Sequence, residues 1–173
     1  KKIKKRKNNA IIFGNIYQKE MLYKDILLNK NKYEVLLKKM SITGVIDIGP
    51  KVDISKSIIF KSININRIGI RSKRYISYLL KNSKVGLVFY PVGQMTKSGI
   101  VAAYASHGLV IVNCCKEEIL RTNEFISSVN YVSKISKNYN NILQKISNES
   151  YKNYKKYALY KTASLIINNL SKN

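Results

Sequence analysis

The sequence contains few acidic residues, cysteines and prolines, and it has no tryptophan. Among 173 residues there are nine Asp and Glu against 32 Lys and Arg, with two Cys and two Pro. No apolar run approaches the roughly 20 residues that a membrane-spanning helix needs. The two cysteines, Cys114 and Cys115, are adjacent, which disfavours a disulfide between them, and no CxxC spacing indicates a metal site. A reducing, cytoplasmic location is therefore expected.

The scarcity of acids leaves a formal net charge of +23. The codons of an AT-rich genome explain the abundance of Lys, Asn, Ile and Tyr, but they do not explain why Glu is rare. The excess charge therefore either faces an anionic membrane surface or a phosphorylated ligand, or has no specific role. Nucleic acid is not the expected partner, because aromatic and basic residues do not cluster on a strand face. A hydrophobic fraction of 45% excludes a disordered chain.

Short apolar segments alternate with amphipathic ones along the sequence, which predicts an α/β, Rossmann-like parallel sheet with helices on both faces. Residues 1–9 are expected to be a solvated basic lead-in, and residues 10–173 to form one domain. Because the sequence starts without Met, we expect it to be a piece of a longer protein. Strands are predicted at residues 10–13, 45–48, 67–70, 85–90, 109–113 and 131–133. Helices are predicted at residues 20–40 with a weak point at 29–32, and at 72–82, 98–107, 116–120, 138–146 and 150–169.

Residues 85–113 are the most informative stretch. An apolar strand leads into a loop with Pro91, then into Ser98 and Gly99, a helix of small residues, a Gly stop and a second apolar strand. This order is one complete βαβ unit whose loop opens onto a helix N-terminus. Such a terminus carries free N–H groups and about half a positive charge, which suits it to phosphate.

Thr96, Lys97, Ser98 and Gly99 are the candidate diphosphate-binding residues of this unit. Gly99 lets the backbone approach a ligand closely, and Lys97 adds charge. Ser98 either donates to a phosphate oxygen or caps the helix. The sequence has no Walker motif and no GxGxxG, so neither P-loop hydrolysis nor a dinucleotide cofactor is expected.

Further candidates follow other strands of the predicted sheet. Gly14 and Asn15 either offer N–H groups to a diphosphate or sugar, or form an ordinary strand-to-helix turn. Arg71 and Arg74 either grip a diphosphate in bidentate fashion or belong to a solvated face. Glu118 follows the strand that closes the βαβ unit, where a ribose would be held.

Residues 85–113, in the order described, resemble the C-terminal, donor-binding domain of GT-B glycosyltransferases of the group-1, family-4-like type. Residues 11–16 resemble the opening strand and Gly loop of that domain. Residues 45–49 resemble its second strand, and residues 68–91 its approach to the donor site. The resemblance covers residues 10–169, nearly the whole sequence.

The sequence departs from the family's Glu-x7-Glu signature. Aligned on Gly108, the two positions are occupied by Met95 and Ala103. In the family the second Glu holds the nucleotide ribose, and the first is linked to the transferred sugar. The sequence therefore resembles a divergent branch in which a basic residue and Ser-Gly replace the acidic motif. His107 is expected to end the helix rather than to act in catalysis, because it lies at the helix end far from the phosphate turn.

The resemblance implies sugar transfer from a nucleoside-diphosphate donor to an acceptor hydroxyl, in polysaccharide biosynthesis at the inner face of the membrane. It also implies an acceptor-binding domain outside this sequence, without which the chain is expected to be inactive. No cofactor is implied, and the lack of a carboxylate cluster predicts a reaction without metal. The alternative is a non-catalytic basic α/β domain that binds nucleic acid or another phosphorylated ligand.

Overall fold

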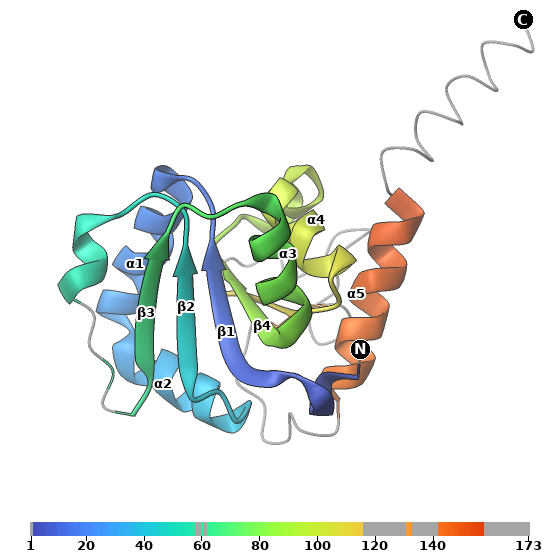
Figure 1. Cartoon of the computed structure of the whole chain (residues 1–173), viewed down its shortest axis with the longest axis horizontal. Helices are drawn as coiled ribbons and strands as arrows, with labels where there is room; N and C mark the ends of the chain where they lie inside the picture. Colours follow the sequence, from blue (N-terminus) through green and yellow to red (C-terminus); the bar gives the residue numbers. More distant parts are fainter. Residues whose placement is uncertain (1, 58–59, 61, 116–130, 133–141, 158–173) are drawn as a thin grey trace, which may run out of the picture.

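Five parallel strands form the centre of the computed structural model, which describes residues 2–57, 60, 62–115, 131–132 and 142–157. Their order in the sheet is β3-β2-β1-β4-β5, with β1 in the middle (Figure 1). The bounds are β1 (Lys7–Phe13), β2 (Gly44–Ile48), β3 (Asn64–Gly69), β4 (Ser83–Val88) and β5 (Val110–Asn113). The α/β, Rossmann-like parallel fold expected from the sequence is confirmed.

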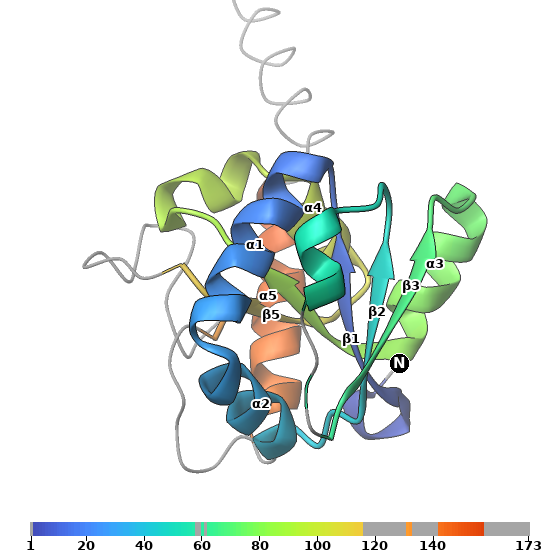
Figure 2. The ribbon, with the colours of Figure 1, turned by 90° about the vertical axis from the view of Figure 1, so that its left-hand side faces the viewer.

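Helices cover both faces of this sheet. Figure 2 shows the first two helices on one side and α3 on the other. The helices are α1 (Ile16–Leu28), α2 (Lys30–Lys39), α3 (Lys73–Asn82), α4 (Gly99–Ser106) and α5 (Leu143–Tyr157). Three 3-10 turns complete the described elements: η1 (Ile3–Lys5), η2 (Asp53–Ser57) and η3 (Val92–Lys97). α4 shares the face of α3, and α5 packs along β5 and α4.

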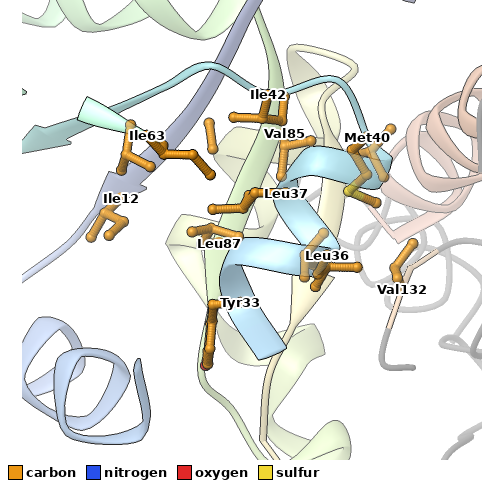
Figure 3. Packing of buried hydrophobic residues seen from close by; sticks show 14 of the residues in the cluster. Ile12, Tyr33, Leu36, Leu37, Met40, Ile42, Ile63, Val85, Leu87 and Val132 are labelled. Carbon is orange, nitrogen blue, oxygen red and sulfur yellow. The ribbon is translucent and has the colours of Figure 1, made fainter. Parts of the chain in front are cut away.

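Alternate residues of each strand point to opposite faces, and both faces are apolar. In β1, Ala10 and Ile12 join the cluster under α1 and α2, whereas Ile11 joins the cluster under α3 and α4. Figure 3 shows side chains of α2, including Leu37, close to Leu87 of β4. Burial on both faces explains why these strands appear as continuous apolar runs.

The basic lead-in expected at residues 1–9 is wrong in its boundary. η1 and the first residues of β1 lie within it, and Ile3 and Arg6 are buried. The backbone N–H of Ile3 donates to Gln144 Oε1 at 2.7 Å. The Arg6 guanidinium tolerates burial because it donates to the main-chain carbonyls of Ser83 and His107, near the beginnings of β4 and β5. These pairings join residues far apart in the sequence, so no local pattern predicts them.

The other boundaries differ in smaller ways. The expected helix at 20–40 is two helices that begin earlier, at Ile16, and divide at Asn29, inside the predicted weak point. α5 bridges the interval between the two helices expected near the C-terminus. Residues 131–132 form an isolated parallel bridge to β5 instead of a strand. The expected helix at 116–120, Ser133 and residues 158–169 lie outside the described residues.

Candidate functional site

The carboxyl ends of the strands meet at one edge of the sheet, where parallel α/β folds bind ligands. The turns after β1 and β2 touch there. A Cβ atom placed on Gly49 would lie 2.7 Å from the carbonyl oxygen of Gly14, and Gly49 has a φ of +109°. Both the close approach and the left-handed backbone therefore require glycine at this position.

The N-terminus of α4 lies against the same turns. A Cβ atom on Gly14 would stand 2.7 Å from Cδ1 of Ile100, in the first turn of α4. Three elements that are far apart in sequence, the β1 turn, the β2 turn and the start of α4, thus converge. In the first turn of α4, the N–H groups of Val101 and Ala102 already donate to Ser98. The main-chain donors that a ligand could use at this helix start are therefore those of Gly99 and Ile100.

Ser98 is the N-cap of α4. Its hydroxyl oxygen accepts from the N–H of Val101 at 3.2 Å, and the side chain is buried. The capping alternative for Ser98 is thus the one seen in this structure. The predicted neighbours Thr96, Lys97 and Gly99 are exposed, and no atom lies within 4 Å of a Cβ placed on Gly99. Open space over Gly99 leaves the helix start accessible to a ligand.

Asn113, at the end of β5, fixes the loop that leads to α4. Its Oδ1 accepts from the N–H of Tyr90 at 3.0 Å, and its Nδ2 donates to the carbonyl of Tyr90 at 2.8 Å. Nδ2 also lies 3.4 Å from the sulfur of Met95, which is 1% exposed. Met95 is therefore a core anchor of this loop, and Ala103 lies within α4.

A buried ion pair supports the turn after β2. Lys19 Nζ lies 2.5 Å from Asp47 Oδ1 and donates to the carbonyl of Pro50 at 2.5 Å. The hydroxyl of Tyr23 donates to Asp47 Oδ2 at 2.7 Å. Lys19 and Asp47 are 2% and 3% exposed. The ammonium therefore links α1 to the backbone of the glycine turn.

This network also keeps the Tyr23 phenol protonated. Burial, and after it the negative charge of Asp47, raises the pKa of Tyr23 well above its usual range. The hydroxyl therefore acts as a donor at every physiological pH. A proton-transfer role for Tyr23 is not supported by this arrangement.

The remaining candidates take different positions. Asn15 caps α1, since its side chain accepts from the N–H of Gln18 at 2.9 Å. Arg71 and Arg74 are exposed at the start of α3, and Arg71 donates to the neighbouring carbonyl of Ile70. Arg67 is separate from them, because its guanidinium donates to Ser55. Glu118 lies outside the described residues.

α4 itself is held tightly against the sheet. The Tyr104 ring lies so close to β4 that a Cβ on Gly86 would be 2.3 Å from it. The Tyr104 hydroxyl donates to the carbonyl of Ile11 at 3.1 Å. His107 is the C-cap of the helix, as expected, with Nδ1 2.8 Å from the carbonyl oxygen of Ala103. The start of α4 is thereby fixed relative to the glycine turns.

Little enclosed space exists beneath the convergence. A hollow of about 10 Å³ lies between β1, β4 and the starts of α1 and α4, with Lys19 and Ile100 in its wall. A ligand here would rest on the surface of the edge and contact main-chain groups. Within the described residues, no three His, Cys, Asp or Glu side chains come close enough to hold a metal ion.

Comparison with known proteins gives a fold-level match. No family model and no curated protein sequence matches this chain. A chain in the crystal structure of the GtfA/B complex superposes with a TM-score of 0.54 at 12% identity, over 96% of this chain and 36% of that chain. The crystal structure of AviGT4, a glycosyltransferase involved in avilamycin A biosynthesis, gives 0.48 at 13% identity, over 88% of this chain and 46% of that one.

This chain therefore spans less than half the length of either neighbour. At 12% identity, the match to the GtfA/B complex shows a common fold. It agrees with the fold expected from residues 85–113 and their flanking strands.

The sequence did not predict the buried polar residues that hold the turns and the loop of the site in place. Lys19, Asp47 and Asn113 are polar side chains buried in positions that a periodicity argument fills with apolar residues. Asp47 does leave a signal, since it is an acid inside the otherwise apolar strand β2 of a chain with nine acids. A buried carboxylate requires a cationic partner, so an acid in this strand indicates a buried ion pair.

Proposed function

We propose that this chain is the donor-binding half of a glycosyltransferase of the GT-B kind. It binds the diphosphate of a nucleotide sugar at the carboxyl edge of the sheet, against the start of α4 at Thr96–Gly99. Gly14 and Asn15 line the neighbouring turn, and Arg71 and Arg74 supply charge from the start of α3. The domain's contribution to the reaction is electrostatic stabilisation of the diphosphate leaving group.

The convergence of Gly14, Gly49 and the start of α4 is the observation that carries this proposal. Main-chain donors need close approach to hold a diphosphate, and side chains larger than hydrogen at these turns would block it. The exposed position of Lys97 next to the helix start adds a positive charge where a phosphate would lie. The shared fold with part of the GtfA/B complex supports the proposal at the level of architecture.

Met95 and Ala103 occupy the positions of the family's two glutamates, so neither supplies a carboxylate. The ribose and the sugar must then be held by other groups, and we assign no catalytic residue to this chain. The length of the neighbours beyond the matched region is consistent with an acceptor-binding partner domain. Sugar transfer by the isolated chain is accordingly not expected.

Isothermal titration with UDP, GDP and CDP tests the proposal directly. We expect one of the three to bind with a dissociation constant below about 1 mM, the weak end of ordinary ligand affinity. The variant Ser98→Asp is expected to abolish that binding, because it places a carboxylate at the diphosphate. Asp is itself a good N-cap, so the helix is retained.

Thr43→Asp is the matched control, because Thr43 is exposed and precedes β2 at the opposite edge of the sheet. It adds the same charge far from the site and should leave the affinity unchanged. Absence of binding by all three nucleotides would overturn the donor-site proposal. Equal affinity in the parent chain and Ser98→Asp would show that the site lies elsewhere.

One observation favours nucleic acid as a second candidate. On the exposed side of α3, the rings of Tyr75 and Tyr78 stack at 6.2 Å between centroids. Arg74 and Lys81 lie on the same exposed face, which combines aromatic and basic groups on a helix. Bases stack on such rings. A salt-dependent affinity for single-stranded RNA that is lost in a Tyr75→Ala, Tyr78→Ala variant would support this candidate.

Location follows from the proposal and remains a prediction. Of the helices that the structure describes, none is long and apolar enough to cross a membrane. A nucleotide-sugar donor is found in the cytoplasm, and the net charge of +23 would favour an anionic membrane surface. Co-sedimentation with anionic and neutral vesicles distinguishes this contact from simple solubility.

A further inference from the structure

A large hollow lies at the opposite edge of the sheet, where the strands begin. Its volume is about 840 Å³, which is in the range of small-molecule sites. The wall is built from the ends of α3 and α4, the residues before β1 and one side of α5. Its described lining residues are Lys2, Arg6, Lys81, Asn82, Ser106, His107, Gly108, Gln144, Ser147, Asn148 and Tyr151.

Three of these residues, Lys2, Arg6 and Lys81, are cationic, and none of the described lining residues is acidic. The Arg6 side chain is held in the protein interior: it is 7% exposed, and its Nη2 donates to the carbonyl of His107 at 2.8 Å. Its Nη1 donates to the carbonyl of Ser83 at 3.1 Å. These hydrogen bonds to carbonyls near the beginnings of β4 and β5 hold the guanidinium in place. A fixed positive charge therefore lies in the cavity wall.

The opposite wall is polar and belongs to α5. Gln144, Ser147, Asn148 and Tyr151 follow the spacing i, i+3, i+4 and i+7, so they share one face of the helix. Gln144 Nε2 donates to Asn148 Oδ1 at 2.8 Å, and the Ser147 hydroxyl donates to the carbonyl of Gly108 at 2.7 Å. These bonds hold an amide pair facing the cavity, with the Tyr151 ring among the lining groups.

We infer that this cavity binds a phosphorylated, hydroxyl-rich small molecule of the sugar-phosphate class. The phosphate lies toward Lys2, Arg6 and Lys81, where its charge meets cations. The hydroxyls lie toward the amides of Gln144 and Asn148, which both donate and accept. This site is separate from the proposed donor site, because it lies at the other edge of the sheet.

Titration with glucose 6-phosphate, inorganic phosphate and glucose tests the inference. We expect glucose 6-phosphate to bind more tightly than phosphate, glucose not to bind at millimolar concentration, and the affinity to fall with added salt. Equal affinity for glucose 6-phosphate and phosphate would overturn the assignment of the hydroxyl contacts. If neither glucose 6-phosphate nor inorganic phosphate binds, the proposed site is overturned.

Two variants locate the binding. Lys81→Glu is expected to weaken glucose 6-phosphate binding by about five- to tenfold, because one attraction becomes a repulsion. Asn148→Leu should weaken glucose 6-phosphate and leave phosphate unchanged. Lys24→Glu, an exposed residue of α1, makes the same charge change away from the cavity and should have no effect. A loss in Lys24→Glu equal to that in Lys81→Glu would show attraction to the net charge alone, and overturn the site.

Ser98→Asp separates this inference from the donor-site proposal. It should abolish nucleotide binding and leave glucose 6-phosphate binding intact. Loss of both would place the sugar phosphate at the donor edge and refute a second site. Failure of nucleotide binding in the parent chain, with glucose 6-phosphate still bound, would refute the donor site alone.

Discussion

The two edges of the sheet differ in how they present binding groups. At the carboxyl edge, two glycine turns and the start of α4 lie in close contact beside a hollow of about 10 Å³. At the amino edge, side chains from four segments surround about 840 Å³. Of these two hollows, the one at the amino edge has the larger volume, whereas the topology of the fold favours the carboxyl edge as a ligand site. A ligand at the carboxyl edge would thus contact mainly the main chain, whereas a ligand at the amino edge would contact side chains.

The edges also differ in what supports them. A buried Lys19–Asp47 pair lies beneath the carboxyl edge and fixes the turn after β2. The amino edge relies on Arg6, which donates to carbonyls of separate elements. In both cases one buried cation joins backbone segments. Lys19 is also paired with the carboxylate of Asp47, so removal of that carboxylate is expected to weaken the carboxyl edge.

The largest effect is expected for Asp47→Ala. It leaves the Lys19 ammonium buried without its carboxylate and removes the acceptor of Tyr23. Breaking such a pair from one side costs about 3–5 kcal/mol of unfolding free energy. Urea denaturation followed by circular dichroism measures it.

The double change Lys19→Met with Asp47→Leu is the control, because it removes both charges. It should destabilise less than Asp47→Ala alone, because no charge is left buried. If Asp47→Ala costs less than about 1 kcal/mol, the pair does not support the carboxyl edge.

Gly49→Ala comes next. The new methyl group meets the Gly14 carbonyl in a left-handed backbone, and we expect a loss of about 2–4 kcal/mol together with weaker nucleotide binding. Gly69 is the matched position, with a φ of +71° and no atom within 4 Å of a Cβ. Gly69→Ala should therefore cost only the backbone term, about 1–2 kcal/mol. Equal losses would show that contact between the two turns has no energetic role.

A crossed binding experiment compares the edges directly. Ser98→Asp and Lys81→Glu are each titrated with the tightest-binding nucleotide and with glucose 6-phosphate. We expect each variant to lose one ligand, by at least about fivefold for Lys81→Glu, and to retain the other. If one variant loses both ligands, the nucleotide and glucose 6-phosphate bind at the same site.

The smallest effect at neutral pH belongs to Cys114, just after β5. Burial raises the pKa of its thiol to about 12, from an ordinary value of about 9. The folded state then holds a proton that the unfolded chain releases, so stability is unaffected below pH 9 and falls between pH 9 and 12. Cys114→Ala should lower that slope in denaturation measured across this range. An unchanged slope would contradict the burial of the thiol.

The apolar pattern predicted the sheet and most of its helices, because strands buried on both faces leave uninterrupted runs such as 85–88 and 110–112. Ser72 and Ser98 also belong to the residue types favoured at helix N-caps, and in the structure each accepts from an N–H three residues on, at the start of α3 and α4. These features are local, and a single sequence contains the information for them.

Features that depend on distant partners could not be predicted in the same way. Lys19 is fully buried, whereas Leu28 in the same helix is 83% exposed. The difference arises because Asp47, 28 positions later, compensates the charge of Lys19. The burial of Arg6 and the amino-edge cavity depend on α3, α4 and α5 meeting in space, which spacing within one segment does not encode.

The central position of β1 has a consequence for synthesis on the ribosome. Of the five strands of the sheet, β1 is translated before the others, but it pairs with β2 on one side and with β4, which begins at Ser83, on the other. One long edge of β1 therefore stays open while some 70 further residues are translated at about 5–20 per second. The hydrogen bond from the Ile3 N–H to Gln144 forms only after still more of the chain has been translated. A pause in translation before Ser83 would lengthen the exposure of an apolar strand edge, and with it the time during which the nascent chain is prone to aggregate or to need a chaperone.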